Sequence, residues 1–226
     1  NLVSLGYFQD ITELKETQDN LEQALNEKAN LLREVHHRVK NNLQVIKSML
    51  NLHERNSNQR PETMLNDCRD RIQTMAMIHD MLYQSDELTN LPFDEYVNEL
   101  VATVLSLNQY SDSSTEVTLD IDPNLDLPLS VAFPCGLIIH EMISNVCKHA
   151  FSPDGKNKLF VSMKQRDNRI HLQVQDNGPG FPDDFEISQA DSIGFEILRA
   201  LGEYELNGTL SVSSEPRTTV ELTFEL

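Results

Sequence analysis

The sequence is short of basic residues, cysteines and long apolar runs, and each shortage excludes a class of protein. It has 18 lysines and arginines against 36 aspartates and glutamates, a formal net charge of −18 at pH 7. Such an excess of negative charge disfavours nucleic acid or an anionic membrane surface as a main partner. Three cysteines are too few and too scattered for a zinc site or a disulfide framework, which suggests a reducing compartment and buried thiols.

No apolar run is long enough to cross a membrane. The longest strongly apolar run, 131–139, contains Pro134 and Gly136, whereas a spanning helix needs about 20 apolar residues. The chain begins at Asn1, with no initiator methionine and no signal-peptide pattern. We therefore expect a soluble, cytoplasmic piece of a longer protein, with no membrane segment in these 226 residues.

Glycine and proline are absent from a long stretch near the N-terminus, about 12–54. Its apolar residues recur in alternating steps of four and three, which predicts one very long helix with an apolar seam, as in a coiled coil. The polar run 55–61 ends this helix, and helical spacing resumes over roughly 62–83. The two helices would form a hairpin, and dimerisation into a four-helix bundle would bury both apolar stripes. The stripe of the second helix consists of Leu65, Cys68, Ile72, Met75 and Leu82.

Two adjacent histidines, His36 and His37, lie inside the long helical pattern. If Val35 is a d position of the heptad and Val39 the next a, His36 falls on the flank of the seam and His37 faces away from it. An exposed imidazole is largely neutral and nucleophilic at physiological pH. The pattern therefore predicts that His37 carries a phosphoryl group.

The pattern changes near residue 112, where a second domain is expected. Five segments alternate apolar and polar residues, as strands do, and helical segments are interspersed among them at 130–150 and 195–205. A further helix, 93–107, links the two halves. Strands with helices set against one face make an α+β sandwich. The strands are predicted at 117–121, 159–163, 170–174, 210–212 and 220–224.

One helix of this second domain carries groups suited to a metal-bound phosphate. Glu141 and Asn145 are four residues apart and therefore share a helix face. Together they can hold Mg²⁺ and orient an attacking group, with the Asn145 amide oxygen as a neutral ligand. Lys148 and His149 continue that face and can meet phosphate. Taken alone, such residues are more often a solvated helix face.

Two glycine-containing segments complete a predicted nucleotide site. Asp176 ends a strand and is followed by Gly178 and Gly180, so its carboxylate can accept a hydrogen bond from an amino group such as that of adenine, while the glycines let the backbone approach the ring. A simple turn between strands is the alternative, but it leaves the second glycine unexplained. Gly194 opens the helix near Phe195, where free backbone amides can face phosphate.

Taken in this order, the motifs closely resemble those of the sensor histidine kinases of the HWE-related subfamily, whose phosphoacceptor box reads like residues 36–44. Residues 31–83 resemble the dimerisation and phosphotransfer hairpin. Residues 137–151 and 176–181 resemble the asparagine box and first glycine box of an ATP-binding domain shared with gyrase-type ATPases. Residues 1–14 look like the last strand and exit of a PAS or LOV sensor domain.

The resemblance implies a multidomain α and α+β protein in three parts. These are the end of a sensor domain with a signalling helix (1–30), the phosphotransfer hairpin (31–91) and the catalytic ATP-binding domain (92–226). It further implies a homodimer that autophosphorylates from Mg-ATP and passes the phosphoryl group to an aspartate in the receiver domain of a response regulator.

The resemblance also assigns roles to individual residues. His37 is the phosphoacceptor, Asn145 the Mg²⁺ ligand, and Asp176 the reader of adenine. Glu141 stands where gyrase-type ATPases have a general base. Gly178 and Gly180 would form the hinge around the base, and Gly194 would be the glycine beside the phosphates.

This chain departs from the family pattern at the second glycine box, which reads Ile193-Gly194-Phe195 where the family is richer in glycine. Only ten residues separate Phe181 from Ser192, so the lid over ATP is expected to be short. A non-catalytic dimeric scaffold with a degenerate ATP site is one alternative function, and the retained site residues argue against it. A gyrase-type ATPase clamp is another, and it leaves the doubled histidine unexplained.

Overall fold

The structure is a computed structural model that describes Lys15, Gln18, Leu21 and seven longer ranges. The chain divides into two compact units, Asn1–Ser48 and Met49–Leu226, and the longer ranges all lie in the second. His36, His37 and most of the predicted helix 12–54 lie outside the described residues. The ranges are 61–84, 90–110, 115–123, 125–153, 155–182, 185–190 and 192–226.

The helices and strands of the second unit follow the predicted order closely. All five predicted strands and the predicted helices after residue 61 are confirmed. Two strands of three residues, β1 and β3, had no counterpart in the prediction. The elements are α2 (Pro61–Gln84), β1 (Asn90–Pro92), α3 (Phe93–Leu107), β2 (Thr115–Ile121), β3 (Asp126–Pro128), α4 (Leu129–His149), β4 (Asn157–Arg166), β5 (Arg169–Asp176), a 3₁₀ turn (Ile187–Gln189), α5 (Ile193–Arg199), a π-helical turn (Ala200–Glu205), β6 (Thr209–Ser213) and β7 (Thr218–Glu225).

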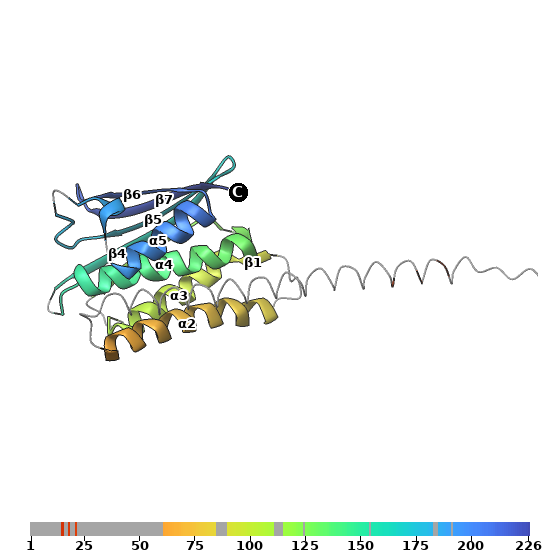
Figure 1. Cartoon of the computed structure of the whole chain (residues 1–226), viewed down its shortest axis with the longest axis horizontal. Coiled ribbons are helices and arrows are strands. Elements are labelled where there is room, and N and C mark those ends of the chain that lie inside the picture. Colours follow the sequence, from red (N-terminus) through yellow and green to blue (C-terminus); the bar gives the residue numbers. More distant parts are fainter. Residues whose placement is uncertain are drawn as a thin grey trace, which may run out of the picture. The chain divides into compact units, whose positions relative to one another are not determined.

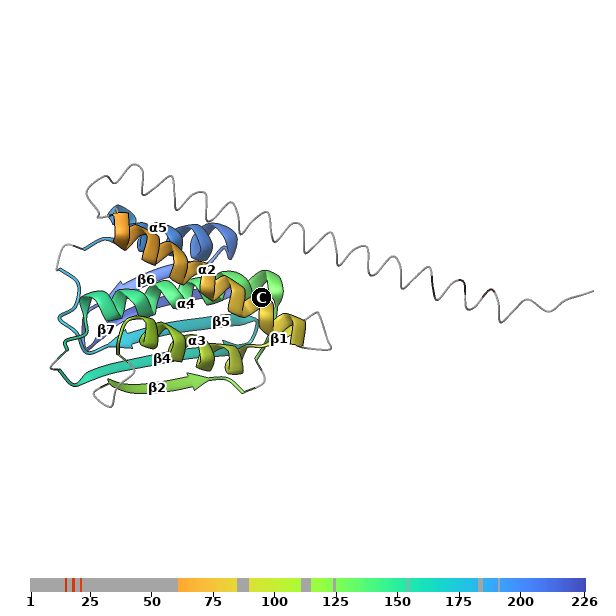
Figure 2. The same ribbon diagram turned by 90° about the horizontal axis from the view of Figure 1, so that it is seen from below.

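The five longer strands form one mixed sheet in the order β2-β4-β5-β7-β6. Strands β2 and β4 run parallel, while the remaining neighbours are antiparallel. Helices α3, α4 and α5 cover one face of the sheet, and α2 lies on the outer side of that helical layer (Figures 1 and 2). Strands β1 and β3 pair separately at the start of α3 and α4.

The core lies between the sheet and α4. In β4 and β5 alternate side chains are buried, among them Leu159, Val161, Leu172 and Val174, which is the pattern of strands with one face covered. Helix α4 is long and apolar enough to cross a membrane by composition, over Ser130–His149, but 78% of that window is buried inside the fold. It is the core helix of an α/β sandwich.

The three cysteines are buried, as predicted. Burial raises the pKa of the Cys147 thiol to about 12. Burial likewise raises the pKa of Cys135. A thiol with a raised pKa is almost wholly protonated at neutral pH and is a poor nucleophile. These two cysteines therefore act as packing residues.

Helix α2 buries part of the predicted apolar stripe and leaves part of it exposed. Cys68 and Met75 are buried, but Leu65 is 64% exposed and Ile72 is 46% exposed. The buried face is rotated toward Arg71 and Thr74, which are 4% and 2% exposed. Polar side chains are buried in folded proteins where partners satisfy them, and both of these residues have partners on α4. Apolar spacing alone could not identify that face.

Candidate functional site

The middle of α4 brings the predicted carboxylate and amide toward the start of α5. Glu141 is 2% exposed, and Asn145 is half-buried one turn later. Gly194 is so close to both that a Cβ atom added there would lie 3.3 Å from Glu141 Oε2 and 3.3 Å from Asn145 Oδ1. Helices α4 and α5 therefore meet at Glu141, Asn145 and Gly194. Their assignment to the phosphate end of a nucleotide site stays a prediction.

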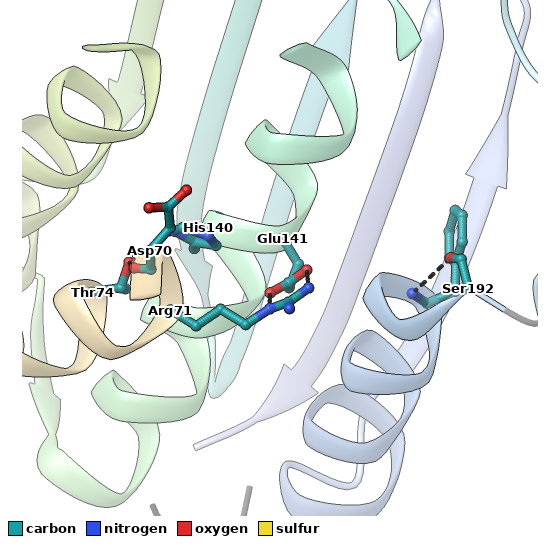
Figure 3. A network of polar contacts seen from close by, with 7 residues as sticks. Asp70, Arg71, Thr74, His140, Glu141 and Ser192 are labelled. Carbon is teal, nitrogen blue, oxygen red and sulfur yellow. Dashed lines mark hydrogen bonds and ion pairs between the residues drawn. The ribbon is translucent and has the colours of Figure 1, made fainter. Parts of the chain in front are cut away.

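Arg71 of α2 forms an ion pair with the Glu141 carboxylate of α4 (Figure 3). Its Nε donates to Oε1, and its Nη2 donates to Oε2 at 2.8 Å. Burial alone would raise the pKa of Glu141, but the hydrogen bonds and charge of Arg71 hold that pKa below its usual range. Glu141 is therefore an ionised carboxylate whose two oxygens both accept bonds from one guanidinium.

A second polar contact joins the same two helices beside the ion pair (Figure 3). The Thr74 hydroxyl lies 2.8 Å from His140 Nδ1 and 3.1 Å from the backbone carbonyl oxygen of Asp70. If the hydroxyl donates its single proton to that carbonyl, it accepts from Nδ1–H, which fixes the tautomer of His140. Burial lowers the pKa of His140, so the buried imidazole is neutral.

Asp176 lies at the end of β5 and is 6% exposed. Its Oδ1 accepts a hydrogen bond of 2.7 Å from the backbone amide of Gly178. Burial raises the pKa of the Asp176 carboxyl, opposed by that amide and by the hydroxyl of Thr218. Thr218 is the β7 residue directly opposite Asp176 in the sheet and is itself buried. It is a site residue that sequence reasoning missed.

The two glycines after Asp176 meet different neighbours. A Cβ at Gly178 would lie 2.7 Å from Ala150 Cα and 2.8 Å from Asp176 Oδ1, so this glycine lets the strand end approach the end of α4. Gly180 has φ +83°, a conformation that favours glycine, and packs against Ser214 between β6 and β7. Both glycines shape the loop, but only Gly178 touches α4.

The segment between the glycine motifs is tied to α5. Phe181, Phe185 and Phe195 form one aromatic cluster, with centroid separations of 4.5, 5.2 and 6.1 Å. Arg199 donates to the backbone carbonyls of Ile187, Ser188 and Ala190. The three phenylalanines follow one another at intervals of four and ten residues in the sequence, so no periodic signal predicted this cluster.

The remaining predicted residues lie at the ends of the two site helices. Lys148 and His149 are exposed in the last turn of α4, on the side of the helix that carries Asn145. Ser192 caps α5, and its hydroxyl oxygen accepts from the amide of Phe195 at 3.4 Å (Figure 3). His37 is outside the described residues, so its relation to these groups stays a prediction.

The described residues fit a purine nucleotide with a divalent ion. A buried carboxylate at a strand end suits an exocyclic amino group, and Gly178 lets that strand end pack closely against Ala150. The amide oxygen of Asn145 beside Gly194 is a hard oxygen ligand of the kind Mg²⁺ takes. Arg71 and Thr74 contact Glu141 and His140 on α4, and Thr218 lies opposite Asp176 in the sheet. They are the polar residues whose contribution depends on partners far away in the sequence.

Two family models match this chain. A family model described as "Histidine kinase" matches residues 34–108, and one described as "Histidine kinase-, DNA gyrase B-, and HSP90-like ATPase" matches residues 133–226. The sensor histidine kinase PdtaS of Mycolicibacterium smegmatis is 31% identical over 213 residues, covering 92% of this chain and 41% of its own length.

Blue-light-activated histidine kinase 2 of Erythrobacter litoralis is 24% identical over 179 residues, covering 75% of this chain and 49% of its own length. The chain thus spans between two fifths and half of the length of these curated relatives. The solved structure of the Erythrobacter litoralis EL346 blue-light activated histidine kinase matches with a TM-score of 0.67 at 22% identity, over 87% of this chain and 63% of that one. That likeness shows a shared fold.

Replacing Gly178 with alanine should destabilise the second unit by about 1–3 kcal/mol, the usual cost of overpacking a close contact. The added Cβ would collide with Ala150 and with the Asp176 carboxylate. Urea unfolding measures the effect. Gly155→Ala is the matched control, since its added Cβ would come no nearer than 3.0 Å to the exposed Ser152, against 2.4 Å to Ala150 in Gly178→Ala. Equal stability of the Gly178→Ala variant and the wild type would contradict the close packing.

His140 should make the fold less stable in mild acid. In the unfolded chain a histidine titrates near pH 6.5, whereas burial lowers the pKa of folded His140, despite the opposing charges of Glu141 and Asp70. Between those two values only the unfolded state binds the proton, so the free energy of unfolding falls as the pH drops below about 6.5. Glu141 titrates below this window, since its pKa is lowered from 4.5.

Urea unfolding at pH 7.5 and pH 5.5 tests this expectation, with His140→Gln as the comparison. Glutamine has no titrating group and keeps a side-chain amide for Thr74. The wild type should lose more stability between the two pH values than the variant. An identical loss in both proteins would show that another group governs the acid response.

Proposed function

Because this chain belongs to the sensor histidine kinases of the HWE-related type, we propose that it transfers the γ-phosphoryl group of ATP to its own His37 and then to a response-regulator aspartate. The observation that carries this proposal is the convergence of Glu141 and Asn145 of α4 with Gly194 of α5, with Asp176 and Gly178 beside the C-terminal end of α4 at Ala150. That arrangement supplies a carboxylate that can bond to a nucleotide base and oxygen ligands for a metal ion bound to the phosphates.

The residues near Asp176 would bind the adenine. Its carboxylate accepts a hydrogen bond from the exocyclic amino group, and Thr218 supports it from the neighbouring strand. Gly178, which packs against Ala150, and Gly180 would form the loop around the base. A carboxylate accepts hydrogen bonds and donates none when ionised, so it favours adenine over guanine, which presents a carbonyl at the same ring position.

Asn145 and the start of α5 would orient the phosphates. The Asn145 amide contributes one neutral oxygen ligand, and Mg²⁺, when bound, neutralises charge that develops on the transferring phosphoryl group. Lys148 and His149, exposed in the last turn of α4, add positive or hydrogen-bonding groups on the same side of the helix. Catalysis of phosphoryl transfer depends mainly on such positioning and charge neutralisation.

His37 would be the nucleophile. The unprotonated ring nitrogen attacks the γ-phosphorus, a nitrogen–phosphorus bond forms, and the bond between that phosphorus and the bridging oxygen breaks to release ADP. The other ring nitrogen must then lose its proton. Glu141 is the carboxylate in the described part of the site that we assign to receive it, as its family position implies.

The partners follow from the same assignment. Leu65 and Ile72 are seven residues apart on one side of α2 and remain exposed, as expected for residues that a four-helix bundle covers in a homodimer. We further propose an upstream PAS or LOV-type sensor domain, a receiver-domain partner and a cytoplasmic location. Neither nucleic acid nor a membrane is proposed as a partner, given the net charge of −18.

Incubation of the protein with γ-labelled Mg-ATP tests the kinase function. We expect label that survives alkali and is lost in acid, as phosphohistidine is, and no label in the His37→Ala variant. Complete absence of label in the wild type would favour a non-catalytic scaffold. Label that survives His37→Ala but disappears in His36→Ala would identify the other histidine as the acceptor.

Asp176→Asn should weaken binding of a non-hydrolysable ATP analogue about 10-fold to 100-fold, since a hydrogen bond to a charged group contributes roughly 1.5–3 kcal/mol. Calorimetric titration measures the affinity. Gln175→Ala is the control, because alternation along β5 directs that side chain to the other face of the sheet. An unchanged affinity in Asp176→Asn would rule out its role in adenine recognition.

A further inference from the structure

The ion pair between Arg71 and Glu141 joins two expected domains. Arg71 lies in the part assigned to the phosphotransfer hairpin, and Glu141 lies 70 residues later, in the ATP-binding part. Both are almost fully buried, at 4% and 2% exposed. A charge buried this deeply is stable only with its partner present, so each helix depends on the other at this point.

The ion pair with Arg71 occupies Glu141, the carboxylate that the proposed phosphoryl transfer needs as a proton acceptor. Both Glu141 oxygens accept hydrogen bonds from Arg71. A proton added to Glu141 would neutralise it and leave the buried guanidinium without its counter-charge. While α2 is docked, Glu141 is therefore a poor proton acceptor, although it lies beside Gly194 at the phosphate end of the site.

A neighbouring contact makes the docking specific. Thr74 is one helical turn after Arg71 and meets His140, the residue before Glu141. The two contacts fix α2 in one register along α4, because a shift of one residue would leave four buried polar groups unmatched. The docked position is thus well defined, and departure of α2 would free Glu141 and His140 together.

We propose that Arg71 is a latch: it holds α2 on α4 with Glu141 bonded, and the kinase step requires α2 to release Glu141. This inference rests on the proposed function. In the released state His37 attacks the γ-phosphorus, the phosphorus–oxygen bond to ADP breaks, and the imidazole proton passes to a free Glu141 oxygen. Arg71 acts through Glu141 and is a positioning residue for this step.

The test compares initial rates of His37 labelling by Mg-ATP in the full chain. In Arg71→Leu the buried carboxylate loses its partner and regains water only if α2 leaves α4, so the released population grows. We expect labelling to be faster than in the wild type by roughly fivefold or more. Arg69→Leu is the matched control, because Arg69 is on the same helix with its side chain 69% exposed, and its rate should equal that of the wild type.

A second pair of variants asks whether the gain depends on Glu141. Arg71→Leu combined with Glu141→Gln should label more slowly than Arg71→Leu alone, because glutamine cannot take the proton. If the double variant labels as fast as Arg71→Leu, the gain does not pass through Glu141 and the latch is overturned.

Hydrogen exchange at the backbone amides of 68–77 reports the docking without reference to activity. Exchange should be faster in Arg71→Leu than in the wild type or in Arg69→Leu. Should Arg71→Leu fail to fold, Arg71→Lys serves in its place, since it keeps the charge but not the two-pronged bond, and a smaller increase in rate and exchange is expected. Unchanged exchange in the folded Arg71 variant would overturn the latch.

The outcomes separate the two proposals. A wild type that takes no label contradicts the proposed function. A wild type that labels, with a natively folded Arg71→Leu variant that labels no faster, contradicts the latch alone. A clear loss of rate in that variant would show instead that Arg71 is needed in the reacting arrangement.

Discussion

A carboxylate buried in the middle of helix α4 is the constraint on which the surroundings of the site depend. Glu141 is 2% exposed, between Ile139 and Met142, which face the apolar core. An ionised group in such a place needs an opposite charge with satisfied hydrogen bonds. Arg71 is that charge, and its position decides which face of α2 is buried. The docking of α2 is therefore determined by electrostatics as much as by apolar packing.

Helix α4 connects this ion pair to the rest of the site. One turn after Glu141, Asn145 approaches Gly194 at the start of α5, and at the end of the helix Ala150 touches Gly178 beside Asp176. The ion pair, the contact with α5 and the contact with the loop after β5 thus all lie along α4. The sheet packs on one side of α4, whereas α2 packs on its outer side and the segment between the glycine motifs is bonded to α5.

How far the sequence predicts this structure depends on whether a signal is local. Alternation located all five long strands and placed Asp176 at the end of one of them. Both are properties of neighbouring residues, which a sequence shows directly. Strands β1 and β3 are three residues long, too short for any period. The burial of Arg71 and Thr74 on α2 was not predicted, because these residues look exposed until their partners, 70 and 66 residues away, are known. The role of His37 remains a prediction.

Stability alone does not explain a buried ion pair between α2 and α4. Removing two charges from water carries a desolvation cost that their attraction only partly offsets, and apolar residues of similar volume are often as stable or more so. Apolar faces, however, lose stability when separated, because water then covers them. Arg71 and Glu141 instead recover hydration when they part. A polar contact of this kind is well ordered when closed and tolerates opening, which suits the release of α2 that we propose.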